Sequence, residues 1–224
     1  MPTAKRLASL TLTALIAGCA TNSVETKLTR SKGEPPKNPQ KAALPKDNAG
    51  TPVPLAIDQL TARGLPKLAI TSSAFGSMKP IPSTYSEYGE KSSPPLKIAG
   101  VPANAKSLLI ICDDPDAMEP KPFVHWTLWN IPANTTELRT AIPATGQVRQ
   151  LMNAKQGTNS AGSVGYFGPK PPIGDRPHHY HFQVFALDRV LPVEQQAIKS
   201  DVIAAAKGHV VAAGEIVGTF AKPK

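Results

Sequence analysis

The chain has 224 residues, a formal net charge of +9, 24 prolines and only 5% aromatic residues. This length suffices for one domain of ordinary size with additional segments. The many prolines disfavour a helical bundle and favour a loop-rich, mainly β domain. The basic residues form no stripe interleaved with aromatic side chains, which argues against nucleic acid as a partner.

The N-terminus has the pattern of a secretory signal. Lys5 and Arg6 precede an apolar run over residues 7–17, which is too short to span a bilayer but fits a signal-peptide core. The run ends in IAGC, which resembles the lipobox of bacterial lipoproteins, in which the cysteine is lipidated. We therefore expect residues 1–18 to be a lipoprotein signal peptide and Cys19 to carry the lipid. An ordinary secretory signal with a chance cysteine is the alternative.

The location expected from this signal is the bacterial cell envelope. Ala20 follows the cysteine where an aspartate would resemble the signal for retention at the inner membrane. The resemblance favours a lipid anchor in the outer membrane, facing the periplasm. Residues 19–58 are polar and rich in Pro, Lys and Asn, so they cannot bury enough apolar surface to fold. They are expected to form a flexible tether with a reach of roughly 35 Å, ahead of a folded domain at 59–224.

Within the folded domain, short apolar runs between turn residues predict several strands. They are expected at 67–75, 107–112, 124–132, 180–188 and 215–220, with a further short strand at 81–85. The run 107–112 is apolar at nearly every position, which predicts burial on both faces. Residues 144–165 are polar and glycine-rich and predict an exposed loop. Residues 193–207 are the one predicted helix, ended by Gly208, so the fold class is mainly β, a β-sandwich with a C-terminal helix.

Alternation along the predicted strands assigns side chains to faces. In residues 124–132, His125, Thr127 and Trp129 are expected on one side and Val124, Trp126 and Leu128 on the other. In the last histidine-rich segment, His178 and Tyr180 share one side, whereas His179 and His181 point away.

The candidate chemistry lies in two polar clusters at strand ends. One contains Asp113, Asp114, Asp116 and His125, and the other is GPKPPIGDRPHHYHF at 168–182. Imidazoles, a phenol and backbone N–H groups of the glycine-bearing loop are hydrogen-bond donors suited to an anion. A nearby carboxylate such as Asp114 would fix a histidine tautomer, and Phe123 and Trp126 would form an apolar wall. The alternative is that the aspartates only stabilise turns and the histidines are surface residues.

Several ordered blocks carry a resemblance to a known family: DPDAM, HWTLWNIP, GPKPPIGDRPHHYHFQVFALD, SSPPL and GHVVAAGEIVGTF. They resemble the phosphatidylethanolamine-binding protein family, also called the Raf kinase inhibitor protein family, in its bacterial branch, over roughly residues 66–221. The resemblance implies a two-sheet β-sandwich with a small anion pocket at one end. The residues matching the family's pocket are Asp114, Asp116, Phe123, His125, Gly168, Pro169, His178 and Tyr180. Met118 and His179 depart from the proline and arginine usual at those positions, which puts ligand identity in doubt.

The resemblance implies a binding module without a cofactor, not an enzyme. Its expected ligand is a small anion or a phospholipid head group, and a protein partner is unidentified. If a histidine holds the anion, affinity should rise as the pH falls through roughly 6.5. A hydrolase using Asp114, His125 and His178 is the alternative, although no Gly-x-Ser-x-Gly elbow is present and Cys112 is expected to be buried. A metal site built from two histidines and a carboxylate is a third possibility.

Overall fold

The computed structural model describes residues 54–117 and 121–222. The predicted signal peptide, Cys19 and most of the predicted tether lie outside the described residues, as does Met118. Among the described residues, no helix combines the length and the apolar character needed to cross a bilayer.

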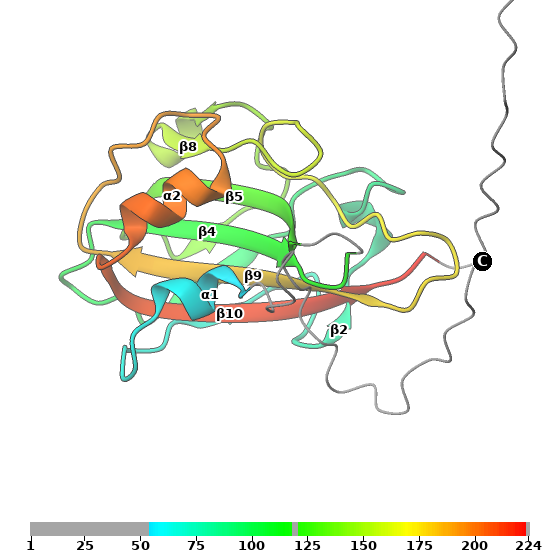
Figure 1. Ribbon diagram of the computed structural model, residues 1–224, viewed down its shortest axis with the longest axis horizontal. Helices are drawn as coiled ribbons and strands as arrows, with labels where there is room; N and C mark the ends of the chain where they lie inside the picture. Colours follow the sequence, from blue (N-terminus) through cyan, green and yellow to red (C-terminus); the bar gives the residue numbers. More distant parts are fainter. Residues whose placement is uncertain (1–53, 118–120, 223–224) are drawn as a thin grey trace, which may run out of the picture. The chain divides into compact units, whose positions relative to one another are not determined.

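The described part is mainly β, as predicted, with ten strands, two α-helices and two short 3₁₀ helices (Figure 1). The helices are α1 (Ala56–Leu60), α2 (Lys199–Ala206), η1 (Ser83–Tyr85) and η2 (Arg149–Leu151). The strands are β1 (Ala69–Thr71), β2 (Lys79–Pro80), β3 (Leu96–Ala99), β4 (Ser107–Asp114), β5 (Phe123–Pro132), β6 (Glu137–Leu138), β7 (Gln147–Val148), β8 (Ala154–Gln156), β9 (His178–Leu187) and β10 (Val210–Phe220).

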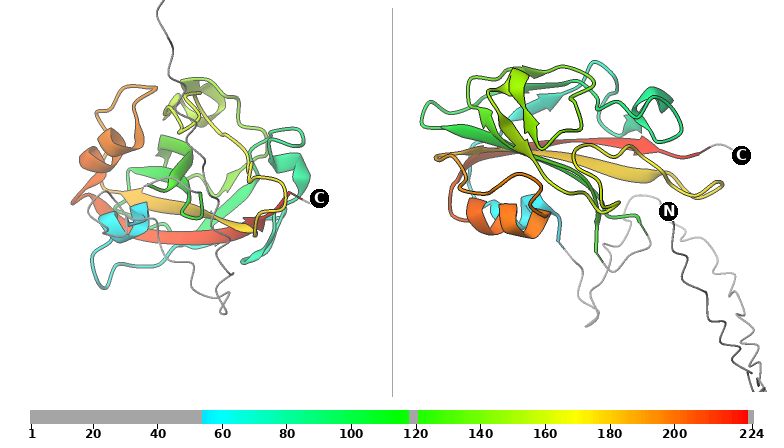
Figure 2. Two further views of the ribbon diagram at one scale, coloured as in Figure 1. Left: turned by 45° about the vertical axis from the view of Figure 1, so that its right-hand side comes forward. Right: turned by 90° about the horizontal axis from the view of Figure 1, so that it is seen from above.

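The strands form two sheets packed face to face. The larger sheet has the order β2-β10-β9-β4-β5-β8-β7, and the smaller one has the order β1-β3-β6. The long central strands β10, β9, β4 and β5 are paired antiparallel. The helices α1 and α2 cover the other face of the large sheet (Figure 2). This confirms the predicted two-sheet β-sandwich.

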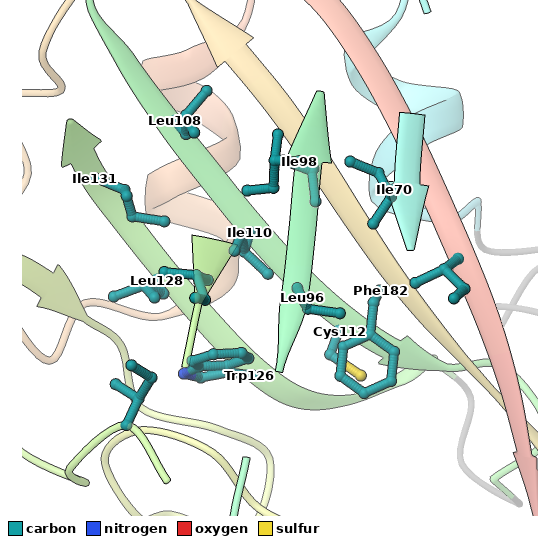
Figure 3. Packing of buried hydrophobic residues seen from close by; sticks show 14 of the residues in the cluster. Ile70, Leu96, Ile98, Leu108, Ile110, Cys112, Trp126, Leu128, Ile131 and Phe182 are labelled. Atoms are coloured by element: carbon teal, nitrogen blue, oxygen red, sulfur yellow. The ribbon is translucent and has the colours of Figure 1, made fainter. Parts of the chain in front are cut away.

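Burial on both faces explains the apolar run in β4. Leu108, Ile110 and Cys112 point into the core between the sheets, whereas Leu109 and Ile111 point into the core under the helices. Figure 3 shows the first core, with Leu96 and Ile98 of β3 facing β4 and β5. All eight residues of β4 are buried, which confirms the prediction for this strand. Each such aliphatic side chain contributes about 1.5–3 kcal/mol of burial free energy.

Strand β5 contains a bulge that overturns the predicted facing of His125. Cys112 pairs with Trp126 and Asp113 pairs with Val124, so His125 is the extra residue in the ladder. A bulge of this kind turns two successive side chains to the same face. His125 therefore shares the face of Trp126 and approaches Tyr180 of β9, with 5.0 Å between ring centroids.

The predicted exposed loop at 144–165 is wrong. It contains β7, η2 and β8, and the two strands extend the large sheet beyond β5. The Gln156 side chain is fully buried. Its amide accepts a hydrogen bond from Trp126 Nε1 at 2.7 Å and donates to the carbonyls of Pro143 and Thr145. These three bonds satisfy the buried amide.

Other element boundaries also differ from the predictions. The expected helix at 193–207 is restricted to α2, since Gln196 has a left-handed φ of 68° that interrupts any helix before Lys199. Gly208 ends the helix as predicted, with a φ of +81°. The expected strand at 81–85 is instead the 3₁₀ turn η1, and the strand expected at 67–75 is limited to β1.

The folded part begins earlier than predicted. α1 lies within the range assigned to the tether, and its Ala56 is fully buried. The N–H of Ile57 donates to Gln183 Oε1 at 2.6 Å, and the N–H of Ala56 donates to Asp113 Oδ2 at 3.4 Å. Lys199 of α2 contacts both oxygens of the same Asp113 carboxylate at 2.7 and 2.8 Å. These polar contacts attach both helices to the sheet.

Candidate functional site

A pocket of ≈ 340 Å³ lies where the end of β4 and the beginnings of β5 and β9 meet. These three strands are neighbours and antiparallel, so their ends converge at one edge of the sheet. The lining residues are Asp114, Ala117, Phe123, His125, Ala161, Phe167, Lys170, Pro171, Pro172, Asp175 and His178. Four of the eight predicted site residues therefore line one hollow: Asp114, Phe123, His125 and His178.

The Asp114 carboxylate and the His178 imidazole form the polar floor of this pocket. His178 Nδ1 donates to Asp114 Oδ2 at 2.8 Å, and both side chains are buried. Burial alone would lower the pKa of His178, but the hydrogen bond to Asp114 and the charges of Asp114, Asp116 and Asp175 outweigh it and raise the pKa. Because Nδ1 faces a carboxylate, the second ring nitrogen, Nε2, gains a proton only in the cation.

His125 has a different protonation behaviour from His178. Its Nδ1–H donates to the Phe167 carbonyl at 2.7 Å, and its Nε2 lies 3.9 Å from Asp114 Oδ2, too far for a hydrogen bond. Burial lowers the pKa of His125 in spite of the opposing charge of Asp114. His125 is therefore neutral at neutral pH, and of the two predicted imidazoles only His178 has a pKa shifted in favour of the cation.

Tyr180 does not line the pocket but packs against the lining residue His125. Its ring meets His125 edge to face, and its hydroxyl is buried without a hydrogen-bond partner among the described residues. Burial and the charge of Asp114 raise the pKa of Tyr180, so the phenol stays protonated. His179 and His181 point away from the pocket, as alternation predicted: His181 Nδ1 lies 3.1 Å from Glu215 Oε2.

Asp116 was predicted to bind ligand, but it has a structural role. Its carboxylate accepts from the backbone N–H of His179 at 2.8 Å and from Arg176 Nη2 at 2.9 Å, and it contacts His179 Nδ1 at 2.6 Å. Its own N–H donates to Asp114 Oδ1 at 2.8 Å. Asp116 therefore positions Asp114 and the start of β9 and leaves no carboxylate oxygen free for a ligand.

The backbone groups of Gly168 and Pro169, two residues predicted to bind the anion, are also engaged elsewhere. The N–H of Gly168 donates to Glu87 Oε1 at 3.0 Å, and the carbonyl of Pro169 accepts from the N–H of Glu87 at 3.0 Å. Glycine is required at 168 because a Cβ there would lie 2.7 Å from the backbone carbonyl carbon of Ser86. This close approach positions the next residues, which do reach the pocket.

Sequence reasoning missed several lining residues, among them Phe167, Lys170 and Asp175. Phe167 packs against Phe123 and His125, with ring centroids 5.7 and 5.9 Å apart, and provides the apolar wall together with Phe123. Trp126, predicted for this wall, is instead fully buried in the core. A signal was available, because Lys170 and Asp175 both lie between Gly168 and His178 in the GPKPPIGDRPHHYHF block.

The described lining residues offer charge and apolar contact but no hydroxyl or thiol side chain. They include no serine, threonine or cysteine. Cys112 is fully buried in the core, and burial with the charges of Asp113 and Asp114 raises the pKa of its thiol. In the described ranges, no group of three or more His, Cys, Asp and Glu side chains has metal-binding geometry.

Comparison with known proteins agrees with the fold. Residues 71–221 match the sequence model of a family described as phosphatidylethanolamine-binding protein. A UPF0098 protein of Pyrococcus horikoshii is 46% identical over 149 residues, which cover 66% of this chain and 74% of the relative. A UPF0098 protein of Methanothermobacter thermautotrophicus is 44% identical, with 66% and 94% covered.

Two solved structures share the fold. A phosphatidylethanolamine-binding protein homologue of Chlamydia trachomatis is 38% identical with a TM-score of 0.62, covering 70% of this chain and 98% of the homologue. YbcL of E. coli, described as a new member of the mammalian family, is 30% identical with a TM-score of 0.65, covering 69% and 98%. The chain therefore belongs to the phosphatidylethanolamine-binding protein family.

Proposed function

We propose that this protein binds a phosphate or carboxylate group, such as a phospholipid head group, in the pocket at the end of β4 and the beginning of β9. The observation that carries the proposal is the buried Asp114–His178 pair, which supports a cationic imidazole at the floor of an otherwise mostly apolar hollow. The charge on His178 and the Lys170 ammonium at the lining provide two cations for one anionic group. The family's name supports the same ligand class.

The apolar part of the pocket determines which anions fit. Phe123, Phe167 and Pro172 surround the polar floor and suit the carbon atoms that carry a phosphate or carboxylate. The neutral His125 adds no charge and packs between Phe167 and Tyr180. A substituted anion, with carbon atoms on the acid group, should therefore bind more tightly than the bare inorganic ion.

We favour binding over hydrolysis by Asp114, His125 and His178. The described lining residues include no serine, threonine or cysteine, and the chain has no Gly-x-Ser-x-Gly elbow. His125 is neutral and is oriented by the Phe167 carbonyl, so it is the candidate general base of the alternative. Turnover of phosphoesters or acyl esters that disappears in His125→Ala would establish the hydrolase instead.

We also propose that the domain is attached to the envelope through Cys19, at the outer membrane. The support is the sequence of residues 1–20 and the polar segment that follows. Mass spectrometry of the N-terminal peptide from membranes should find a lipid on Cys19, and Cys19→Ser should release the protein into the soluble fraction. A peptide that begins at another residue, with no lipid, would refute the anchor.

The binding proposal is tested by titrating the protein with phosphoethanolamine and inorganic phosphate near pH 6, followed by NMR and calorimetry. His178→Gln should weaken binding at least about tenfold because it removes the cation. His181→Gln is the matched control, since His181 lies on the same strand, on the opposite face, and contacts Glu215. Equal affinity in all three proteins, or no binding by the wild type, would overturn the proposal.

A further inference from the structure

One carboxylate at the pocket mouth, that of Asp175, is not explained by anion binding. Asp175 Oδ2 lies 3.7 Å from His178 Nε2, the ring nitrogen opposite the one that contacts Asp114. The His178 imidazole is therefore placed between two carboxylates. Asp175 is the more accessible of them, with 37% of its side chain exposed against 4% for Asp114.

The turn that carries Asp175 is held in place on several sides. The N–H of Asp175 donates to the Pro172 carbonyl at 3.2 Å, and Gly174 supplies the positive φ of 80° that this turn needs. Next to it, Arg176 is fixed by Asp116, and Ile173 pairs with Lys222 through a β-bridge. The backbone position of Asp175 at the pocket mouth is thus built into the fold.

We propose that Asp175 is an internal counter-anion of the pocket, which competes with a bound anion for the outer nitrogen of His178 and so sets the affinity and charge preference of the site. This inference rests on the proposed function, because it concerns the same pocket. A ligand anion that contacts His178 Nε2 must share or displace the Asp175 carboxylate. The repulsion grows with the ligand's charge, so a dianion is disfavoured relative to a monoanion of similar size.

The charges around His178 support this assignment. The groups that face it are Asp114 at Nδ1, Asp175 at Nε2, Asp116 behind Asp114, and the neutral His125. Lys170 also lines the pocket. With His178 protonated, the described lining carries two cations, His178 and Lys170, and two carboxylates, Asp114 and Asp175, so it has no net positive charge with which to bind a dianion.

Asp175→Asn tests the proposal because it keeps the size of the side chain and leaves the backbone turn intact. The variant should bind inorganic phosphate at pH 6 about three- to tenfold more tightly than the wild type, which is the Coulomb range for one partly screened like charge. The gain should be larger for sulfate, which is a dianion at this pH, and should diminish at 1 M salt. Asp188→Asn is the control, since Asp188 also contacts a histidine, His209, but lies roughly 30 Å along β9.

The same samples give a second readout that does not depend on a ligand. The His178 ring signal in NMR should titrate at lower pH in Asp175→Asn than in the wild type, because a carboxylate that favours the cation is gone. Equal or weaker phosphate binding by Asp175→Asn, with the wild type binding, would overturn the inference and leave the proposed function intact. Absence of phosphate binding by both proteins would instead refute the proposed function.

Discussion

His178 Nδ1 lies 2.8 Å from Asp114 Oδ2 and joins two residues 64 positions apart in the sequence. β4 and β9 are neighbours in the large sheet, and the bond is made where β4 ends and β9 begins. The contact makes the His178 cation more stable than burial alone would allow, and the first prediction depends on that charge.

Anion binding should decrease as the pH rises through the raised pKa of His178, above the ordinary value of about 6.5. Sulfate is the suitable probe because it does not titrate in this range. Affinity should be highest below about 6.5 and should fall on the alkaline side, and Asp114→Asn should move the fall to lower pH. Sulfate affinity measured by calorimetry from pH 5.5 to 8.5 would contradict this if it were constant.

The combined contribution of His125 and His178 to the stability of the folded domain should be largest near pH 6.5. The raised pKa of His178 stabilises the fold fully below about 6.5, and this contribution is lost as the pH rises through the folded-state value. The lowered pKa of His125 destabilises the fold as the pH falls below about 6.5, since the unfolded chain binds the proton more readily.

Urea unfolding at pH 5, 6.5 and 8 measures the two effects separately. His125→Asn keeps a donor for the Phe167 carbonyl and should reduce the loss of stability between pH 6.5 and 5. His178→Gln should reduce the loss between pH 6.5 and 8. The more exposed His181→Gln should leave both differences almost unchanged. The two histidine assignments are wrong if the effects appear on the opposite sides of pH 6.5.

Gly168→Ala should destabilise the domain by about 1–3 kcal/mol, the usual cost of overpacking. The new Cβ would lie 2.7 Å from the Ser86 carbonyl carbon and 2.7 Å from the Tyr85 oxygen, and neither is a flexible side chain. Gly76→Ala is the matched control because its Cβ would meet only the Lys79 side chain, at 3.3 Å. Thermal and urea unfolding compare the two variants, and a similar small effect in both would show that the Gly168 backbone can move.

The buried Asp113–Lys199 pair should be more important for stability than an exposed pair. Replacing one partner, in Asp113→Asn or Lys199→Met, should cost about 3–5 kcal/mol because a buried charge is left uncompensated. The double variant should cost less than the sum of the two. Glu194→Gln removes the contact with Lys155 at 3.1 Å, but Glu194 is 89% exposed, so its loss should stay below about 1 kcal/mol. Additive losses in the double variant would contradict coupling between Asp113 and Lys199.

Regular alternation made part of the site predictable from the sequence. In β9, His178 and Tyr180 face the core between the sheets and His181 faces away, because this part of β9 pairs with β10 without a register shift. Alternation gave the wrong face for His125. The bulge arises from the pairing of β4 with β5, and the sequence around His125 alone does not indicate it.

Composition misled the prediction at residues whose polar groups are satisfied inside the fold. Gln156 looks like a loop residue, yet its amide is used by Trp126 and by two backbone carbonyls. Asp116 resembles a ligand-binding acid, yet its oxygens are occupied by His179 and Arg176. In both cases the partners lie at least 11 residues away in sequence, so only the tertiary structure could identify them.

Asp113 and Asp114 are consecutive, and β4 directs them to opposite faces: one anchors the helical layer and the other orients His178. The register of β4 is thereby fixed from both faces of the large sheet. A slip of one residue along the chain would put one acid in the place of the other and leave either His178 facing Pro115 or Lys199 facing Cys112. Insertions or deletions within this strand should consequently be far more damaging than substitutions at either acid.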